Sequence, residues 1–552
     1  MNAGASAPAP RFDAVVIGAG FAGIYMLYRL RQMGLKTRVY EAGEGVGGTW
    51  YWNRYPGARC DVESMQYSYS FSEELQQEWR WSERYPRQDE ILRYINHVAD
   101  RFALRDDIAL QTRVTHADFD EASQRWTVRT DRGDVVSAQF LISAGGCLSA
   151  ARVPEVPGLE TFKGAWYHTG HWPHETVDFG GQRVGVIGTG SSGIQIIPSI
   201  ARQARQLVVF QRTPNFSIPA WNRPLPAEEQ QAWKADYAAH RAKARTTRSG
   251  ILYEYSQRAT SEVSEQERQH EYQRRWLRGG ANFTHAFNDI FTNRRSNECA
   301  AQFVREKIRA TVSDPRIAAL LAPTDHAIGT KRICVDTDYY ETFNLKHVSL
   351  VDLRATPIAE IVPGGIRTEA ATHALDSIVF ATGYDAVTGA LDRIEIRGRG
   401  GVALKDTWSA GPRTYLGLMT AGFPNLFFIT GPGSPSILTN VVVAIEQHVD
   451  WIARCLRHLR DQGLCVAEPV ASAQQDWVAH VGEVASKTLF TGANSWYMGA
   501  NIPGKPRVFL PYVGGMANYT AICEEVVAEG YRGFEFEAAG AGAGVAGKEA
   551  PA

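Results

Sequence analysis

The stretch Asp13-Ala14-Val15-Val16-Ile17-Gly18-Ala19-Gly20-Phe21-Ala22-Gly23 decides the fold of this 552-residue chain. Its first five residues predict a short strand, and the residues from Ile24 to Met33 have helical spacing. Strand, G-x-G-x-x-G loop and helix form the dinucleotide-binding fingerprint, because the glycines let backbone N–H groups at a helix N-terminus approach a pyrophosphate. We therefore predict a nucleotide site at Gly18, Gly20, Ala22 and Gly23.

An acidic residue follows this loop at the expected distance. The next predicted strand, Thr37 to Tyr40, ends in Glu41. An acid roughly 20 residues beyond the first glycine binds ribose hydroxyls in this kind of fold. Glu41 therefore suits the ribose of FAD or NAD.

A second copy of the pattern follows later in the chain. Arg183 to Ile187 predicts a strand, Gly188-Thr189-Gly190-Ser191-Ser192-Gly193 repeats the glycine loop, and a helix continues through Ile200. Here the partner strand, Leu207 to Phe210, is followed by the basic residue Arg212. Because a guanidinium accommodates a 2′-phosphate, this site suits NADP. Two copies of one site, or a chance match, are the alternatives.

An aromatic connector, Phe162 to Pro173, precedes the second loop. We expect its four large rings to be mostly buried, because each removes a large apolar area from water: Phe162, Trp166, Tyr167 and Trp172. His168 then lies on a packed joint between two cofactor-binding halves, where it could transmit movement. The alternative is a buried, hydrogen-bonded histidine in a structural linker.

Two further segments carry candidate functional charges. Residues 47–61 are rich in glycine and aromatics, which predicts either a packed Ω-type loop or a loop that wraps a large flat cofactor. In the second case Asp61 would lie near the reactive edge of that cofactor. Lys331 and Arg332 are adjacent, and such a pair of cations is by itself typical of a solvated or salt-bridged surface.

The chain as a whole predicts an α/β protein with two Rossmann-like dinucleotide-binding domains. Residues 222–325 lose the strand pattern and become helical and charge-rich, which indicates a helical insertion in the second domain with a solvated charged face. We expect a disordered lead (1–10), a first domain in two parts that binds FAD (11–153 and 385–537), an NADP-binding domain (154–384) and a disordered Ala/Gly tail (538–552).

Composition argues against several classes of protein. The length allows roughly three or four domain-sized units, and 44% hydrophobic residues are typical of a globular protein with a large core. A net charge of -1 gives no reason to expect nucleic acid or an anionic membrane as a partner. Seven scattered cysteines without C-x-x-C argue against a disulfide framework, a zinc site and a dithiol centre. With no visible signal peptide or membrane span, we expect a cytoplasmic protein without a metal.

With both loops in place, the chain resembles the type I Baeyer–Villiger monooxygenases, nearest their phenylacetone and steroid monooxygenase branch, from about Asp13 to Phe536. The connector fits that family's signature F-x-G-x-x-x-H-x-x-x-W-[PD] at every fixed position. Residues 47–61 fit a second signature through Gly48, Trp50, Tyr55, Pro56, Gly57 and Asp61. Sister flavin monooxygenases carry Tyr or Phe where this chain has Trp172.

The resemblance implies an FAD-dependent enzyme that consumes NADPH and O2 and converts ketones to esters or lactones through a C4a-peroxyflavin, with sulfoxidation as a side activity. Arg332 would stabilise the peroxy anion and the oxyanion, and Asp61 would orient it through an ion pair. Lys331 and Trp496 would contact NADP, and His168 would coordinate domain rotation. The implied partner is a small ketone; the oligomeric state is not implied, and a monomer is compatible with the sequence.

The resemblance also assigns further residues to cofactor binding. Besides the first loop and Glu41, they are Thr49, Trp50, Tyr51, Trp52, Arg59, Cys60, Asp61, Tyr67, Val114, Gly188, Gly190, Ser191, Ser192, Gly193, Ile194, Gln195, Ile196, Arg212, Thr213, Lys331, Arg332, Val441 and Trp496. By the same resemblance, Ser436 to Thr439 would line the substrate pocket.

Three alternatives stay open at this point. An N- or S-oxygenating flavin monooxygenase would share both loops, although Trp172 argues against it. A flavin disulfide reductase would need the C-x-x-C that the chain lacks. A non-catalytic nucleotide-binding protein could keep the same fold. Aryl, cyclic and steroid ketones are all compatible with the sequence.

Overall fold

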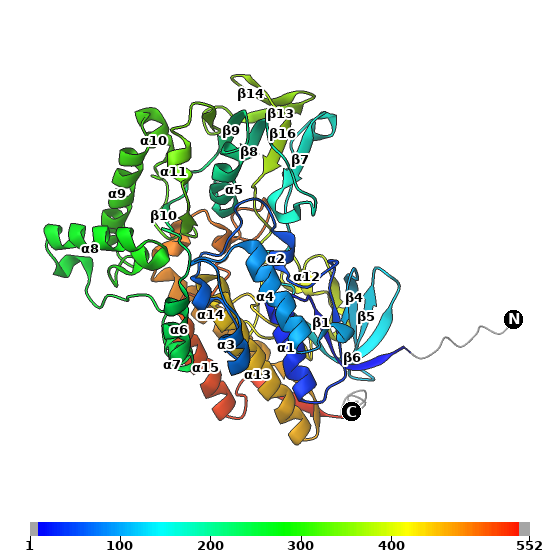
Figure 1. Cartoon of the computed structure of the whole chain (residues 1–552). Helices are drawn as coiled ribbons and strands as arrows, with labels where there is room; N and C mark the ends of the chain where they lie inside the picture. Colours follow the sequence, from blue (N-terminus) through cyan, green and yellow to red (C-terminus); the bar gives the residue numbers. More distant parts are fainter. Residues whose placement is uncertain (1–8, 540–552) are drawn as a thin grey trace, which may run out of the picture.

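Two β-sheets with parallel centres organise the computed structural model, which describes residues 9–539 (Figure 1). One sheet holds β1, β4, β5 and β6 in the lower half of the view, and the other holds β7, β8, β9 and β16 at the top. A helical lobe containing α8, α9 and α10 projects to one side. The mixed α/β architecture with two nucleotide-binding-type sheets confirms the predicted fold class.

The first sheet has eight strands in the order β17-β4-β5-β6-β1-β2-β3, with β18 paired to β6. β1 pairs in parallel with β2 and β6, while β4, β5 and β6 run antiparallel to one another in turn. Its strands are β1 (Arg11–Ile17), β2 (Thr37–Tyr40), β3 (Ile108–Ala109), β4 (Val114–Asp120), β5 (Arg125–Thr130), β6 (Val135–Ser143), β17 (Glu395–Arg397) and β18 (Leu426–Phe428). Segments from both halves of the chain therefore build this sheet.

Helix α1 (Phe21–Gln32) follows β1 through the first glycine loop. Gly18 turns the chain with φ +101°, and a Cβ at Gly23 would lie 1.8 Å from the Gly18 carbonyl oxygen. Only glycine therefore lets the helix begin so close to the strand. α1 packs with α13 (Val441–Asp461) in the largest apolar core, and α2 (Thr49–Trp52), α3 (Glu73–Glu78), α4 (Gln88–Arg101), α12 (Leu404–Thr407), α14 (Ala471–Ser486) and α15 (Met516–Ala528) complete this half.

The second sheet is entirely parallel, in the order β12-β9-β8-β16-β7. Its strands are β7 (Ala165–His168), β8 (Arg183–Ile187), β9 (Gln206–Gln211), β12 (Val348–Asp352) and β16 (Ser377–Phe380). Helix α5 (Ser191–Ala201) follows β8 through the second glycine loop, where a Cβ at Gly193 would lie 2.2 Å from the Gly188 carbonyl oxygen. A small antiparallel sheet covers part of this half: β13 (Ile358–Val362), β14 (Gly365–Thr368) and β15 (Thr372–Ala374).

The aromatic connector is an edge strand of the second sheet. β7 pairs in parallel with β16, and the short helix η4 (Thr169–His171) follows it. The expectation that its rings are mostly buried is wrong for Trp166, which is 44% exposed. Because alternate residues of a strand point to opposite faces, Trp166 faces outward while Tyr167 is partly covered. Among the four rings, only Trp172 is fully buried.

Helices and loops alone connect β10 (Ser217–Pro219) with β11 (Cys334–Asp336), as predicted for residues 222–325. The helices are α6 (Ala227–Ala235), α7 (Tyr237–Arg245), α8 (Glu265–Arg278), α9 (Arg294–Thr311) and α10 (Pro315–Leu321), and α11 (Tyr339–Thr342) follows β11. The apolar faces of α8, α9, α10 and α11 join the core of the second domain, whereas Trp233 of α6 and Tyr237 of α7 pack in the core of the first.

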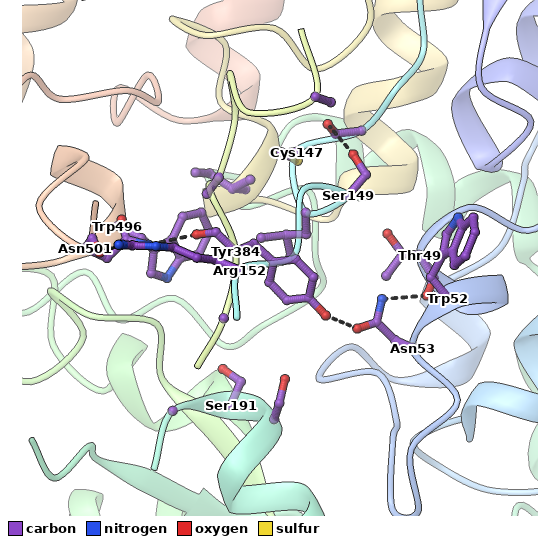
Figure 2. A pocket seen from close by; sticks show the side chains of 18 of the residues that line it. Thr49, Trp52, Asn53, Cys147, Ser149, Arg152, Ser191, Tyr384, Trp496 and Asn501 are labelled. Carbon is purple, nitrogen blue, oxygen red and sulfur yellow. Dashed lines mark hydrogen bonds between the residues drawn. The ribbon is translucent and has the colours of Figure 1, made fainter. Parts of the chain in front are cut away.

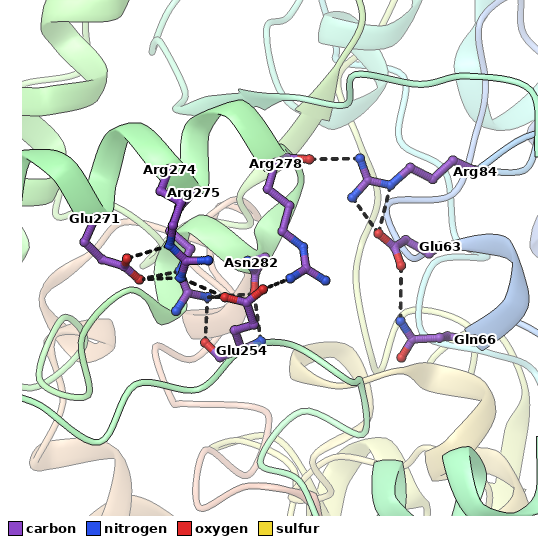
Figure 3. Close-up of polar contacts among 9 residues, drawn as sticks. All are labelled: Glu63, Gln66, Arg84, Glu254, Glu271, Arg274, Arg275, Arg278 and Asn282. Atoms are coloured by element: carbon purple, nitrogen blue, oxygen red, sulfur yellow. Dashed lines mark hydrogen bonds and ion pairs between the residues drawn. The ribbon is translucent and has the colours of Figure 1, made fainter. Parts of the chain in front are cut away.

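A hydrogen bond links this insertion to the first domain, and ion pairs lie on each side of it (Figure 3). Arg84 pairs with Glu63 at 2.6 Å and also donates to the carbonyl oxygen of Arg278 at 2.9 Å. On the insertion side, Glu254 pairs with Arg274 at 2.7 Å and with Arg278. Arg275 in the same helix is only 3% exposed. The expectation of a simply solvated charged face is therefore wrong for part of α8. Its arginine side chains form ion pairs within the insertion, and one of them is buried.

The chain ends differ slightly from the prediction. β20 (Phe534–Ala538) pairs with β19 (Leu464–Pro469), so Ala538, expected in the tail, belongs to a strand. Residues 9 and 10 precede β1 without regular structure. The rest of the predicted disorder, at residues 1–8 and 540–552, lies outside the described residues. We keep the division into 11–153, 154–384 and 385–537 as a proposal.

Candidate active site

Both glycine loops open onto one cavity of about 1210 Å³. A site for one small molecule fills roughly 300–1,000 Å³, so this cavity has room for more than one large ligand. Figure 2 shows part of its wall, where side chains from residues 49–53, from the turn at Tyr384 and from the loop that carries Trp496 and Asn501 converge.

The first glycine loop is closed by Glu41, which is 5% exposed. Its Oε2 accepts from the Ala19 N–H at 2.8 Å, and its Oε1 accepts from the Gly43 N–H at 2.8 Å. Burial raises the pKa of this carboxyl, and the backbone donors counteract it. A Cβ at Gly20 would approach Gly48 Cα to 3.3 Å, so the two segments form a narrow glycine-lined cradle.

The second glycine loop is open. Nothing lies within 4 Å of a Cβ built on Gly190, which lines the cavity. Arg212 is exposed and forms no ion pair within residues 9–539, and Lys331 lies near it. Burial lowers the pKa of Lys331, Asp325 opposes this effect, and the charges of Arg212 and Arg354 lower it further. This end of the cavity is therefore prepared for an anion such as a phosphate.

Arg332 and Asp61 form an ion pair on the cavity wall. Arg332 Nε lies 3.2 Å from Asp61 Oδ2, and its Nη1 donates to the Ile437 carbonyl oxygen at 3.1 Å. Burial acts to lower the pKa of Arg332, but Asp61, together with Tyr497 and Cys60, outweighs it and the pKa is raised. Burial raises the pKa of Asp61, so this carboxylate depends on Arg332 to stay ionised. The other oxygen, Asp61 Oδ1, is buried without a hydrogen-bond partner in the described chain.

His168 is 2% exposed and does not line the cavity. Its Nδ1 accepts from the Gly170 N–H at 3.0 Å, and its Nε2 lies 3.1 Å from the Arg152 carbonyl oxygen and 3.3 Å from Thr382 Oγ1. Burial lowers its pKa to about 4, so the ring is neutral near pH 7. Because Arg152 and Thr382 lie on the two chain crossings between the sheets, His168 joins those crossings.

Most other predicted residues line the cavity. They are Gly18, Gly20, Ala22, Glu41, Thr49, Trp50, Trp52, Arg59, Cys60, Asp61, Tyr67, Val114, Gly188, Gly190, Ser191, Ser192, Gln195, Arg212, Thr213, Lys331, Arg332, Val441 and Trp496. Outside its lining are Gly23, Tyr51, Gly193, Ile194, Ile196 and His168. Ile194 and Ile196 are fully buried in the core of the second domain, because that face of α5 points away from the cavity.

Two predicted residues have side chains engaged elsewhere. Gln195 Oε1 accepts from Tyr55 Oη at 2.8 Å, and its Nε2 donates to the Arg59 carbonyl oxygen at 3.0 Å. The Arg59 guanidinium pairs with Glu83 at 2.7 Å. Both side chains therefore hold the loop 55–59 in place at the boundary between the two domains.

Sequence reasoning missed several residues of the wall. Four of them line the cavity and are linked by hydrogen bonds: Asn53, Arg152, Tyr384 and Asn501 (Figure 2). They come from four distant segments and share no local pattern. Asn53 lies in the segment 47–61 and Tyr384 in the small-residue turn after β16, but nothing in the sequence marked either side chain.

The comparisons identify the family. A model described as pyridine nucleotide-disulphide oxidoreductase matches residues 15–267. The chain is 44% identical to an acetone monooxygenase (methyl acetate-forming) of Gordonia sp. (strain TY-5), over 95% of this chain and 98% of that one. A solved structure titled oxidized steroid monooxygenase bound to NADP matches with a TM-score of 0.92 and 54% identity, over 96% and 99% of the chains. The chain belongs to the Baeyer–Villiger monooxygenases.

As a member of that family it is an NADPH-dependent flavoprotein monooxygenase, with FAD and NADP as its cofactors. One relative of similar standing differs in name: a phenazine N-monooxygenase of Lysobacter antibioticus is 43% identical over 95% of this chain and 96% of that one. Family membership therefore confirms the predicted enzyme class but leaves oxygenation of nitrogen as an alternative reaction.

Cysteines, metal-type side chains and helix lengths were also compared. All seven cysteines are free thiols. Within residues 9–539, no three His, Cys, Asp or Glu side chains group as they would around a metal ion. No helix in that part of the chain combines the length and apolar character that a bilayer span requires.

Proposed function

We propose that this enzyme inserts an oxygen atom beside the carbonyl carbon of a small ketone, and that Arg332 is its catalytic cation. The observation that carries the proposal is the Arg332–Asp61 ion pair on the wall of a cavity shared by two nucleotide loops. A guanidinium fixed by a carboxylate is a preorganised charge, which favours any step that develops negative charge on oxygen.

The residues at the first loop fit FAD. The cradle of Gly20 and Gly48 admits a backbone-close pyrophosphate, which a Cβ at either position would crowd. Glu41 is fixed near the loop by two backbone donors, so its position suits a ribose. The buried Asp61 Oδ1 has acceptor capacity left for a polar ligand group. We infer that Trp50, Trp52, Cys60 and Tyr67 hold the flavin part.

The residues at the second loop fit NADPH. The open backbone at Gly190 leaves space for the pyrophosphate at the N-terminus of α5, a position that favours anions. Arg212 and Lys331 would hold the 2′-phosphate. Trp496 would cover the nicotinamide end, because it lines the same cavity as the second loop.

FAD, once reduced by NADPH, supplies the activation of O2 for insertion next to the carbonyl. The protein would exclude water from the place where oxygen reacts and would stabilise the negative charge that develops there. Arg332 presents its guanidinium, with Nε committed to Asp61 and Nη1 to Ile437, so its orientation is fixed before the substrate arrives. Closure of the loop that carries Trp496 would exclude water from the cavity.

The substrate class is a small-molecule ketone. Ser436, Ile437 and Thr439 line the cavity next to Arg332, while Leu438 does not. We propose that these residues shape the ketone site. The free thiols support a reducing cytoplasm as the location.

Arg332→Ala tests the proposal. NADPH should still reduce the flavin, while ester or lactone formation should fall by roughly 10²–10³, the loss typical of one stabilising donor. Stopped-flow absorbance would follow flavin reduction, and product analysis would follow oxygenation. Normal ester yield from this variant would remove Arg332 from the mechanism.

The N-oxygenating alternative rests on the phenazine N-monooxygenase relative. Parallel reactions of the purified enzyme with a panel of ketones and with aromatic nitrogen heterocycles such as phenazines separate the two. Ester or lactone from ketones supports the main proposal, and N-oxide without any ester favours the alternative.

A further inference from the structure

A carboxylate lies among the cations at the second nucleotide loop. Asp325 lines the cavity together with Arg212 and Lys331. Its Oδ2 lies 3.7 Å from Arg354 Nη1, and Arg354 also pairs with Asp352 at 3.9 Å. Among the charges that shift the pKa of Lys331, that of Asp325 has the largest effect. The end of the cavity that suits a phosphate therefore already holds one negative charge of the protein's own.

A buried histidine holds this carboxylate in place. His326 Nδ1 lies 2.7 Å from Asp325 Oδ1, and the histidine side chain is only 1% exposed. Because a carboxylate only accepts hydrogen bonds, the ring donates from Nδ1. Burial lowers the pKa of His326, so the ring is neutral near pH 7 and adds no charge to the site. The ring also packs against Phe216, with 5.4 Å between the ring centroids, so the side chain that orients Asp325 is itself fixed.

The cations around Asp325 differ in how they are neutralised. Arg354 pairs with two carboxylates, whereas Lys331 and Arg212 form no ion pair within residues 9–539. Burial acts to raise the pKa of Asp325, but the hydrogen bond from His326 and the charge of Lys331 outweigh it and the pKa is lowered. Asp325 is therefore ionised at neutral pH, and its charge acts on the two unpaired cations and on any anion bound beside them.

We propose that Asp325 is a specificity-determining residue of the nucleotide site, whose carboxylate offsets part of the attraction of Lys331 and Arg212 for a 2′-phosphate. It thereby keeps the nucleotide exchangeable and lowers the preference for NADPH over NADH. This inference rests on the proposed function, which assigns the second loop to NADPH.

Three physical effects of this carboxylate act in the same direction. It repels a phosphate directly, and it neutralises part of the charge of the cations that would bind the phosphate. It can also accept a hydrogen bond from a ribose 2′-hydroxyl, as the acid of an NAD site does. Asp325 therefore weakens the binding of NADP+ without weakening that of NAD+.

Asp325→Asn in the FAD-loaded enzyme tests the proposal, because the amide keeps the size of the side chain and can still accept from His326. Titration calorimetry with NADP+ should give a Kd below that of the wild type by roughly two- to fivefold, the range of one partly exposed ion pair. The Kd for NAD+ should stay the same or rise. Glu341→Gln is the matched control: it removes an exposed carboxylate on α11, outside the cavity lining, and should leave both Kd values unchanged.

Ionic strength separates an electrostatic role of Asp325 from a structural one. The gain in NADP+ affinity should be present at an ionic strength of about 0.1 M and largely lost at about 1 M, because the screening length falls from roughly 10 Å to roughly 3 Å. A Kd for NADP+ that is unchanged or higher in Asp325→Asn would overturn the proposal. So would a gain that is equal for NAD+ or that does not depend on salt.

This titration does not depend on ketone oxidation. NADP+ affinity that depends on Asp325, in an enzyme that forms no ester or lactone from any ketone, would contradict the proposed function but not the role of Asp325. Ester formation by the wild type, with unchanged NADP+ affinity in Asp325→Asn, would contradict the role of Asp325 alone.

Discussion

The two glycine loops have the same backbone but end in opposite chemistry. The strand after the first loop ends at Glu41, whose two oxygens are both bonded to backbone N–H groups. The strand after the second loop leads to Arg212, which is exposed and forms no ion pair in the part of the chain that the structure describes. The difference lies in a side chain, not in the fold.

That difference fits two modes of cofactor use. A buried acid held by two hydrogen bonds is preorganised, which favours a nucleotide that stays bound. A solvated cation gains a partner only when an anion arrives, which favours a nucleotide that exchanges. We therefore propose FAD at the first loop and NADPH at the second, on the basis of the surroundings of Glu41 and Arg212.

The largest expected effect on stability comes from a crowded loop glycine, Gly23, and contrasts with the open position Gly190. Gly23→Ala places a Cβ 1.8 Å from the Gly18 carbonyl oxygen, a backbone atom that cannot turn aside. We expect a loss of about 1–3 kcal/mol or more in the free energy of unfolding, together with loss of bound flavin. Thermal unfolding and the flavin absorbance of the purified variant measure both.

Gly190→Ala is the matched control for that prediction. Its Cβ meets nothing within 4 Å, and its φ of -83° is ordinary for alanine. Stability and flavin content should stay at the wild-type level, while NADPH binding weakens because the Cβ enters the open cavity. Equal destabilisation by both substitutions would contradict the distinction between a packed and an open loop position.

Arg212→Ala tests the opposite charge at the second loop. Removing a charged hydrogen bond of about 1.5–3 kcal/mol should lower the preference for NADPH over NADH by roughly 10–100-fold, almost all of it through KM for NADPH. Steady-state kinetics with both nucleotides give the ratio. An unchanged ratio would remove Arg212 from the 2′-phosphate site and leave Lys331 as the candidate.

Local patterns were sufficient for the two loops, because strand, glycine turn and helix are adjacent in sequence and each glycine is required by a close contact. Glu41 and Arg212 followed from spacing for the same reason. The Arg332–Asp61 pair joins residues 271 positions apart and could be anticipated only from a family resemblance. The contacts among Asn53, Tyr384 and Asn501 had no sequence signal, since each depends on how distant segments fold together.

The smallest expected effect concerns the joint between the two halves, at His168. Its Nδ1 accepts a hydrogen bond from Gly170, which a protonated ring cannot do, and burial lowers its pKa to about 4 from an ordinary value of 6.5. The unfolded state therefore binds more protons between these two values. The contribution of neutral His168 to the free energy of unfolding is complete above about pH 6.5 and is lost as the pH falls towards 4.

His168→Gln should remove this part of the acid sensitivity. Between pH 7 and pH 5 the wild type should lose about 2 kcal/mol more unfolding free energy than the variant, following the roughly 1.4 kcal/mol per pKa unit of linkage. Urea unfolding at the two pH values gives the difference, and His270→Gln, at an exposed histidine, is the control. Identical pH dependence in the wild type and His168→Gln would mean that the joint tolerates a charged ring, and that the two halves are held together chiefly by their other contacts, such as Gln195 with the loop 55–59.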